Sequence, residues 1–166
     1  MTGGGGAAFD PLGLIRILND QGVRYVVIGG IAAGVQGAIW ATADLDIVYA
    51  RDPDNHERLE RALADLNAVP IDLPADVKVI LDARSLRAGH TWTLSTRLGR
   101  LDLLAESAGL DYATLASRSR PFAGSERYLV ASIEDLITMK VAAGRPKDAG
   151  QVELLRRVAE ESRRDA

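Results

Sequence analysis

The most constraining feature of this 166-residue sequence is a pair of acidic residues inside an apolar run. Asp44 and Asp46 alternate with Leu45 and Ile47, and a β-strand places residues i and i+2 on the same face. The two carboxylates therefore share one face, while Leu45 and Ile47 face the core. Because two nearby negative charges repel each other, a divalent cation would stabilise them, and paired carboxylates suit Mg²⁺. The pattern favours a metal site over the alternative, an edge strand with a solvated acidic face.

Two further features point to the same kind of site. Gly29 and Gly30 end the apolar run 25–28, and a glycine pair after a strand is most often an ordinary turn. It can also let the backbone approach a phosphate closely. Asp102 interrupts the apolar segment 100–104, where a carboxylate needs a partner such as a cation or a salt bridge. Together, the glycine pair and the three acids predict a site for a nucleotide phosphate and a metal.

Composition limits the classes of protein to which the chain can belong. A chain of 166 residues that is 47% apolar fits one globular domain with a substantial core. It has no cysteine, no signal-peptide pattern and no apolar run near the ~20 residues that span a bilayer, so we expect a cytoplasmic protein without a membrane partner. The net charge of −3 does not indicate general nucleic-acid binding, although local arginine clusters could hold RNA or a nucleotide. His56 and His90 give no zinc pattern, and we interpret both as exposed.

Apolar periodicity and capping residues predict a mixed α/β (α+β) fold. Strands are expected at 24–28, 44–49, 90–96, 100–104 and 128–130, with 90–96 and 100–104 forming an antiparallel hairpin. Helices are expected at 11–22, 30–37, from Asp54 or Asn55 to 66, 111–116, 133–144 and from 145 onward. Residues 67–74 are expected to form a loop, and 76–89 fit either a strand or a short helical turn. We divide the chain into a flexible glycine-rich tail (1–8), a domain (9–131) and C-terminal helices packed on it (132–166).

These motifs, taken as a set, resemble the nucleotidyltransferase superfamily that includes DNA polymerase β. The superfamily pattern is an apolar residue and Gly-Gly, followed after roughly ten residues by Asp-x-Asp. Within the superfamily, the resemblance is to the AbiEii/MenT-type toxin-like minimal nucleotidyltransferases. Their motifs match Gly29-Gly30-Ile31-Ala32, Thr42-Ala43-Asp44-Leu45-Asp46, Asp102 between leucines, Lys140, and Arg145-Pro146-Lys147-Asp148. The resemblance implies a polymerase β-like domain, with a mixed sheet flanked by helices and a C-terminal helical pair.

The resemblance also implies a reaction, the transfer of a nucleoside monophosphate from a nucleoside triphosphate to an acceptor hydroxyl. In such an enzyme one or two Mg²⁺ ions bridge the acids and the nucleotide phosphates, and one acid helps to deprotonate the acceptor. The metal ligands implied here are Asp44, Asp46 and Asp102, with Asp102 also acting on the acceptor hydroxyl. The residues implied to face the triphosphate are Gly29, Gly30, Thr42, Lys140, Arg145 and Lys147.

Three of these roles have structural alternatives that the sequence leaves open. Lys140 could be a surface lysine beside Asp135 or Glu134. Thr42 could merely begin the strand rather than bond a phosphate. Asp148 is catalytic if the resemblance holds, but it could instead be an N-terminal helix residue stabilised by the helix dipole.

Two positions depart from the pattern of the narrower group and bear on substrate choice. Trp40 stands where that group usually has arginine, and Gln151 stands where it usually has its last aspartate. Trp40 could remove a phosphate contact or could stack on a base. Three functions remain open: a toxin paired with an antitoxin and acting on tRNA or a protein hydroxyl, an enzyme that modifies a small antibiotic, and a non-catalytic module that binds a nucleotide or a partner. The presence of all three acids argues against the third.

Overall fold

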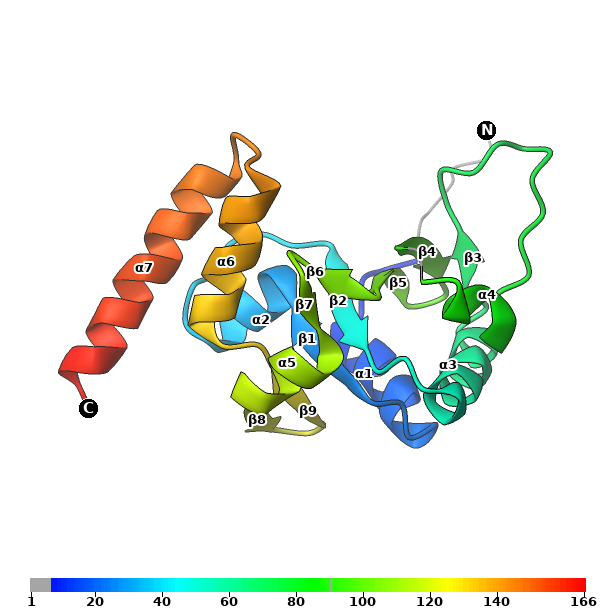
Figure 1. The fold of residues 1–166 in the computed structure, drawn as a ribbon, viewed down its shortest axis with the longest axis horizontal. Helices are drawn as coiled ribbons and strands as arrows, with labels where there is room; N and C mark the ends of the chain where they lie inside the picture. The colour runs from blue at the N-terminus through cyan, green and yellow to red at the C-terminus, as the bar shows by residue number, and fades with distance from the viewer. Residues whose placement is uncertain (1–6, 90) are drawn as a thin grey trace.

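A mixed sheet, seven-stranded within the described residues 7–89 and 91–166, forms the centre of the computed structural model (Figure 1). Its strand order is β3-β4-β5-β2-β1-β9-β8. The strand bounds are β1 (Tyr25–Ile28), β2 (Asp44–Tyr49), β3 (Val69–Pro70), β4 (Trp92–Thr96), β5 (Gly99–Leu104), β8 (Arg120–Ala123) and β9 (Arg127–Val130). β1 pairs in parallel with β9 and β2 in parallel with β5, whereas the other neighbours are antiparallel. β6 (Glu106–Ser107) and β7 (Leu110–Asp111) form a separate small sheet.

Helices surround this sheet. Their bounds are α1 (Pro11–Asp20), α2 (Gly29–Val35), α3 (Pro53–Asp65), α4 (Ala83–Arg87), α5 (Tyr112–Arg118), α6 (Ile133–Ala143) and α7 (Asp148–Arg164). In Figure 1, α6 and α7 lie as a pair at one end of the molecule, and α3 and α4 lie at the other. Among the described helices, none has the length and apolar character needed to cross a membrane. The predicted α/β fold with a C-terminal helical pair is confirmed.

Of the two strands at the middle of the sheet, β1 is buried on both faces and β2 is fully buried on the face opposite its acids. Val26 and Val27 of β1 have no solvent exposure, although their side chains point to opposite faces. Strands covered on both sides are near-continuous apolar runs, which explains the run at 25–28. In β2, Leu45 and Ile47 are also fully buried, as predicted. The alternating acids of β2 therefore occupy the opposite face of a strand whose position the core fixes.

Asn55 ties the start of α3 to the ends of the two central strands. Its fully buried side chain accepts a hydrogen bond from the Arg24 N–H at 2.7 Å, and donates to the carbonyls of Arg24 (3.1 Å) and Ala50 (2.7 Å). The N-cap of α3 is instead Asp52, whose carboxylate accepts from the Asn55 N–H at 3.1 Å. The prediction that Asp54 or Asn55 caps this helix is wrong, because the Asn55 side chain bonds to the strands.

His56 is also placed differently from the prediction. It is buried, with 1% exposure, and its ring packs edge-on against Tyr49 with the centroids 6.0 Å apart. Burial lowers the pKa of His56, which favours the neutral ring. The first turn of α3 turns this side chain inward, so the prediction of an exposed helix residue is wrong. His90 lies outside the described residues.

Several short elements differ from the sequence predictions or were missed. β3 forms inside the expected loop 67–74, and the ambiguous segment 76–89 contains the helix α4, which Asp82 and Ser85 cap reciprocally. α7 begins at Asp148 rather than at residue 145. β6, β7 and β8 were not predicted, because strands of two to four residues carry too little alternation to be recognised. Residues 1–6 of the predicted tail lie outside the described residues.

We predict that Asn55→Ala lowers the free energy of unfolding by about 3 kcal/mol, because the Arg24 N–H and the buried Ala50 carbonyl lose their side-chain partner and the Arg24 carbonyl loses one of its two hydrogen bonds. Urea denaturation followed by circular dichroism would measure the change. Glu57→Ala, at an exposed position of the same helix, is the matched control and should stay within about 0.5 kcal/mol of the parent. Equal midpoints for the two variants would contradict a structural role for the Asn55 bonds.

Candidate active site

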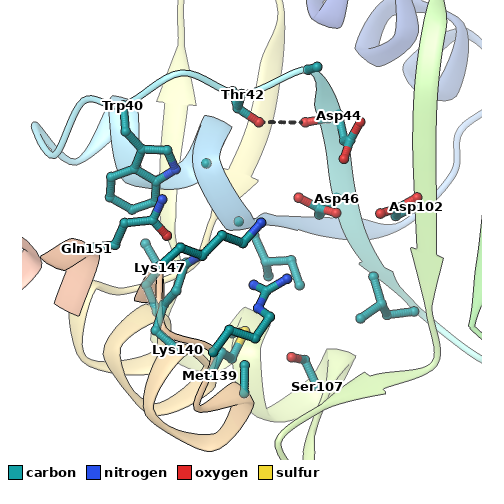
Figure 2. A pocket seen from close by; sticks show the side chains of 18 of the residues that line it. Trp40, Thr42, Asp44, Asp46, Asp102, Ser107, Met139, Lys140, Lys147 and Gln151 are labelled. Atoms are coloured by element: carbon teal, nitrogen blue, oxygen red, sulfur yellow. Dashed lines mark hydrogen bonds between the residues drawn. The ribbon is translucent and has the colours of Figure 1, made fainter. Parts of the chain in front are cut away.

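Parallel pairing of β2 with β5 gathers the three acids predicted from the sequence. Asp46 lies directly opposite Asp102 in the register, and Asp44 lies opposite Arg100. Side chains that are directly opposite on one face of a strand pair are neighbours. Figure 2 shows the carboxylates of Asp44, Asp46 and Asp102 at the same side of one pocket. Thr42 also lines this pocket, and its hydroxyl donates to the carbonyl of Asp44 at 3.3 Å, which fixes the entry into β2.

Burial and mutual repulsion control the ionisation of this acidic cluster. Loss of hydration, followed by the negative charge of Asp102, raises the pKa of Asp46 to about 8. Burial also raises the pKa of Asp102. Arg100 offsets part of the negative charge, because its Nε lies 3.4 Å from Oδ1 of Asp44. Within the described part of the chain, Oδ1 of Asp44 and Oδ1 of Asp102 are buried and have no hydrogen-bond partner. Such unsatisfied acceptors are costly, and a bound cation would satisfy them.

The chemistry of this donor set fits a hard divalent cation. No group of three or more His, Asp or Glu side chains in the described ranges forms a preformed metal cluster. Mg²⁺ does not need such a cage, because it is usually held by one or two carboxylates together with waters and substrate phosphates. The oxygens of Asp44 and Asp102 that lack a hydrogen bond within the described residues, with Asp46 beside Asp102, supply this kind of incomplete, all-oxygen set.

Gly29 and Gly30 allow α2 to lie against the segment that leads into β2. Gly29 begins α2 with φ +67°, a conformation that favours glycine. A Cβ at Gly29 would collide with the carboxylate of Asp46, and a Cβ at Gly30 would lie 2.8 Å from the Cβ of Thr42 and 3.1 Å from Nε1 of Trp40. The glycine pair is therefore more than an ordinary turn, because the pocket wall closes only without side chains at these positions.

Three cationic side chains lie across the pocket from the acids. Lys140 of α6, together with Arg145 and Lys147 of the following turn, lines the same cavity of about 360 Å³. Asp148 does not line it, although all the other site residues predicted from the sequence do. Asp148 is 1% exposed, and its carboxylate pairs with Nζ of Lys140 at 3.2 Å and with Nε of Arg145 at 2.8 Å. The hydrogen bond from Arg145, which outweighs the effect of burial, and that from Lys140 lower the pKa of Asp148. Asp148 thus lies behind the cations and holds them in place.

These contacts bear on the structural alternative for Lys140, a surface lysine beside Asp135 or Glu134. The Lys140 side chain is 15% exposed and pairs with Asp148, whereas Asp135 pairs with Arg118 at 2.7 Å. The alternative of a surface lysine beside Asp135 is therefore wrong.

The two departures from the motif pattern lie on one wall of the pocket. Trp40 and Gln151 both line it, and the ammonium of Lys140 lies 5.3 Å from the centroid of the Trp40 ring. Oε1 of Gln151 is buried and has no hydrogen-bond partner among the residues that the structure describes. Nothing in their separation along the sequence indicated that these two residues share a wall.

Sequence analysis missed a further, largely apolar part of the lining. The residues that form it come from β1, β5, the β6–β7 hairpin and α6: Ile28, Leu104, Ser107, Leu136, Met139 and Ala143. Ser107 belongs to a two-residue strand that had no sequence signal. The apolar residues would have been assigned to the core, and only the structure shows that they also border the cavity.

The fold is similar to that of a solved structure described as a nucleotidyltransferase. The TM1012 protein of Thermotoga maritima, whose crystal structure is described as that of a "putative nucleotidyltransferase", matches this chain with a TM-score of 0.56 and 19% sequence identity. The match covers 93% of this chain and 97% of that chain. No protein-family model and no curated protein matches the sequence. The likeness establishes the fold, and the polymerase β-like architecture expected from the motifs agrees with it.

We predict that Asp148→Asn lowers the free energy of unfolding by about 2 kcal/mol at neutral pH, because Lys140 and Arg145 lose a buried charged partner. The folded-state pKa of Asp148 lies below its unfolded value of about 3.9, so its stabilisation is present above that pH and is lost as the pH falls through the folded-state pKa. Thermal denaturation across this range should show the variant and the parent converging in acid.

Asp165→Asn, at an exposed position beyond the end of the same helix, is the control for this measurement. It should follow the parent at every pH. A difference between Asp148→Asn and the parent that stays constant into strong acid would contradict a role for the Asp148 charge.

Proposed function

We propose that the protein is a Mg²⁺-dependent nucleotidyltransferase that moves a nucleoside monophosphate from a nucleoside triphosphate to an acceptor hydroxyl. The observation that carries the proposal is the pairing of Asp46 with Asp102, opposite the cations Lys140, Arg145 and Lys147 in one pocket. Carboxylates that can hold a metal, facing cations that can hold phosphates, meet the two needs of phosphoryl transfer. The nucleotidyltransferase-like fold supports the same proposal.

The acidic wall is the proposed place of the metal. Asp44, Asp46 and Asp102 would hold one or two Mg²⁺ ions, whose positive charge would neutralise the charge that develops on the phosphates. The cavity of about 360 Å³ lies within the range of sites that take small ligands.

In the proposed reaction, the acceptor oxygen forms a bond to the α-phosphorus as the bond from that phosphorus to the bridging oxygen breaks. Pyrophosphate leaves, and the carboxylate of Asp102 takes the hydroxyl proton. Lys140 and Arg145 would neutralise the leaving pyrophosphate through charge-assisted hydrogen bonds. Gly29 and Gly30 also line the pocket, and their backbone N–H groups would face the triphosphate.

At a finer level, we infer that the protein is the toxin of a toxin–antitoxin pair and that its acceptor is a tRNA end or a protein hydroxyl. The support is the resemblance of its motifs to the AbiEii/MenT-type group, whose glycine, acidic and Lys/Arg segments here all border one pocket. A cognate antitoxin would then be its partner. Growth arrest on expression is the expected phenotype, whereas resistance to an aminoglycoside or lincosamide would favour an antibiotic as the acceptor.

We predict that Asp46→Asn and Asp102→Asn each reduce nucleotidyl transfer by about 1000-fold or more, because each removes a carboxylate from the proposed metal site. Purified protein would be incubated with Mg²⁺, each labelled nucleoside triphosphate and total tRNA, and label would be sought in RNA, in added protein and in the enzyme itself. EDTA should abolish transfer and excess Mg²⁺ should restore it.

Asp20→Asn, at an exposed position at the end of α1, is the control and should transfer label like the parent. Absence of transfer from all four triphosphates to every acceptor would refute the proposal. A cellular effect that survives Asp46→Asn would instead favour a non-catalytic binding module.

A further inference from the structure

Resting on the proposed function, we propose that Trp40 and Gln151 form the subsite for the nucleobase, and that this subsite selects a base with an amino group at C6 of a purine or C4 of a pyrimidine, adenine or cytosine. Both residues lie on the wall that carries the two departures from the motif pattern, and the metal site alone does not determine which nucleotide binds.

The indole of Trp40 is held in a defined place on this wall. Its Nε1 lies within van der Waals reach of Gly30, where a Cβ would be only 3.1 Å away, and the ammonium of Lys140 lies 5.3 Å from the ring centroid. Trp40 is half-buried and lines the pocket, so part of the ring remains open to a ligand. Every nucleobase has a π-face that can stack on such a platform.

Gln151 adds a hydrogen-bonding group to the same wall. It projects from the first turn of α7, and in Figure 2 its amide lies near Trp40, at the side of the pocket away from Asp102. Oε1 is buried, and no donor among the described residues bonds to it. Buried carbonyl oxygens are normally satisfied, so a ligand that brings an N–H donor to this place gains a hydrogen bond that the protein has left open.

The chemistry of the wall suits a base better than a phosphate. Neither Trp40 nor Gln151 carries a positive charge, and both an unpaired carbonyl oxygen and the negative face of an aromatic ring disfavour an anion. The groups that suit phosphates are the adjacent cations Lys140, Arg145 and Lys147. An amino group at the edge of adenine or cytosine supplies the missing donor, whereas the carbonyl at the matching place in hypoxanthine or uracil would meet Oε1 with a second acceptor.

The test compares ATP with ITP and CTP with UTP, pairs in which an amino group is replaced by a carbonyl and the adjacent ring nitrogen gains a proton. The parent should bind ATP about tenfold more tightly than ITP, and CTP about tenfold more tightly than UTP. A tenfold ratio of affinities is the difference expected when one hydrogen bond is gained or one acceptor is left facing another. Gln151→Leu should reduce both ratios to near one. Gln151→Glu, which keeps an acceptor at this place, should preserve them.

Tryptophan fluorescence reports the stacking directly. The chain contains two tryptophans, Trp40 and Trp92, so Trp92→Phe leaves Trp40 as the reporter. Trp92 lies on β4, outside this pocket, and its replacement should leave the ATP/ITP ratio unchanged. α,β-Methylene analogues of ATP and CTP with Mg²⁺ should quench Trp40, whereas tripolyphosphate, which has no base, should bind without quenching it. Trp40→Leu should weaken the binding of ATP, ITP, CTP and UTP about tenfold while leaving the binding of tripolyphosphate unaffected. Trp40→Phe should weaken nucleotide binding less.

The outcomes separate this inference from the proposed function. If the protein transfers label but binds ATP and ITP equally, the base subsite is overturned and the proposed nucleotidyltransferase activity is not. The same holds if Trp40→Leu and Gln151→Leu leave the nucleotide affinities unchanged. A preference for UTP and ITP would overturn the assignment of an amino-bearing base. Quenching by tripolyphosphate equal to that by the nucleotides would place phosphates on this wall and overturn the inference. If the parent binds neither the nucleotides nor tripolyphosphate, both the base subsite and the proposed function are overturned.

Discussion

The neighbouring carboxylates of Asp46 and Asp102 are the interaction on which the rest of the site depends. Two half-buried carboxylates side by side raise the free energy of each other's charged form, and the loss of hydration raises it further. The core holds them there. Leu45 and Ile47 are fully buried on the other face of β2, and Leu101 and Leu103 are fully buried on β5. A slip of one residue would expose these apolar side chains and bury the acids, so the register that crowds the acids is also one that keeps the apolar side chains in the core.

The cationic wall on the other side of the pocket partly compensates this negative charge. The charge of Lys140 partly offsets the rise in the pKa of Asp46. The pKa of Arg145 is raised first by the hydrogen bond that it donates to Asp148, and the charge of Asp46 adds to this rise. Asp148 makes this possible because it holds both cations while remaining outside the pocket lining. The pocket is thus a gap between an acidic and a basic wall, which would accommodate a metal–phosphate complex better than either component alone.

Local signals in the sequence were sufficient to predict the main helices and strands, but not how these elements pair and pack. The alternation around Asp44 and Asp46 predicted β2, and Ser132 predicted the start of α6, where its hydroxyl accepts from the Asp135 N–H at 3.1 Å. The pairing of Asp46 with Asp102 depends on contacts between strands far apart in the chain, and no local pattern encodes it. Asn55 illustrates the same limit: a good capping residue by type, it bonds instead to the ends of β1 and β2. Asp148 could be placed near the cations, but not behind them.

The positions of Trp40 and Gln151 show how substrate choice could change while the rest of the site remains. The pattern that this chain resembles has an arginine and an aspartate there, a pair with no net charge, and Trp40 with Gln151 also has none. Exchanging one neutral pair for the other leaves the electrostatic balance between the acidic and basic walls unchanged. The wall that these two residues form presents an aromatic face and a buried carbonyl oxygen that has no hydrogen-bond partner among the described residues. Because both positions border the same cavity, Trp40 and Gln151 would act together on whatever binds there.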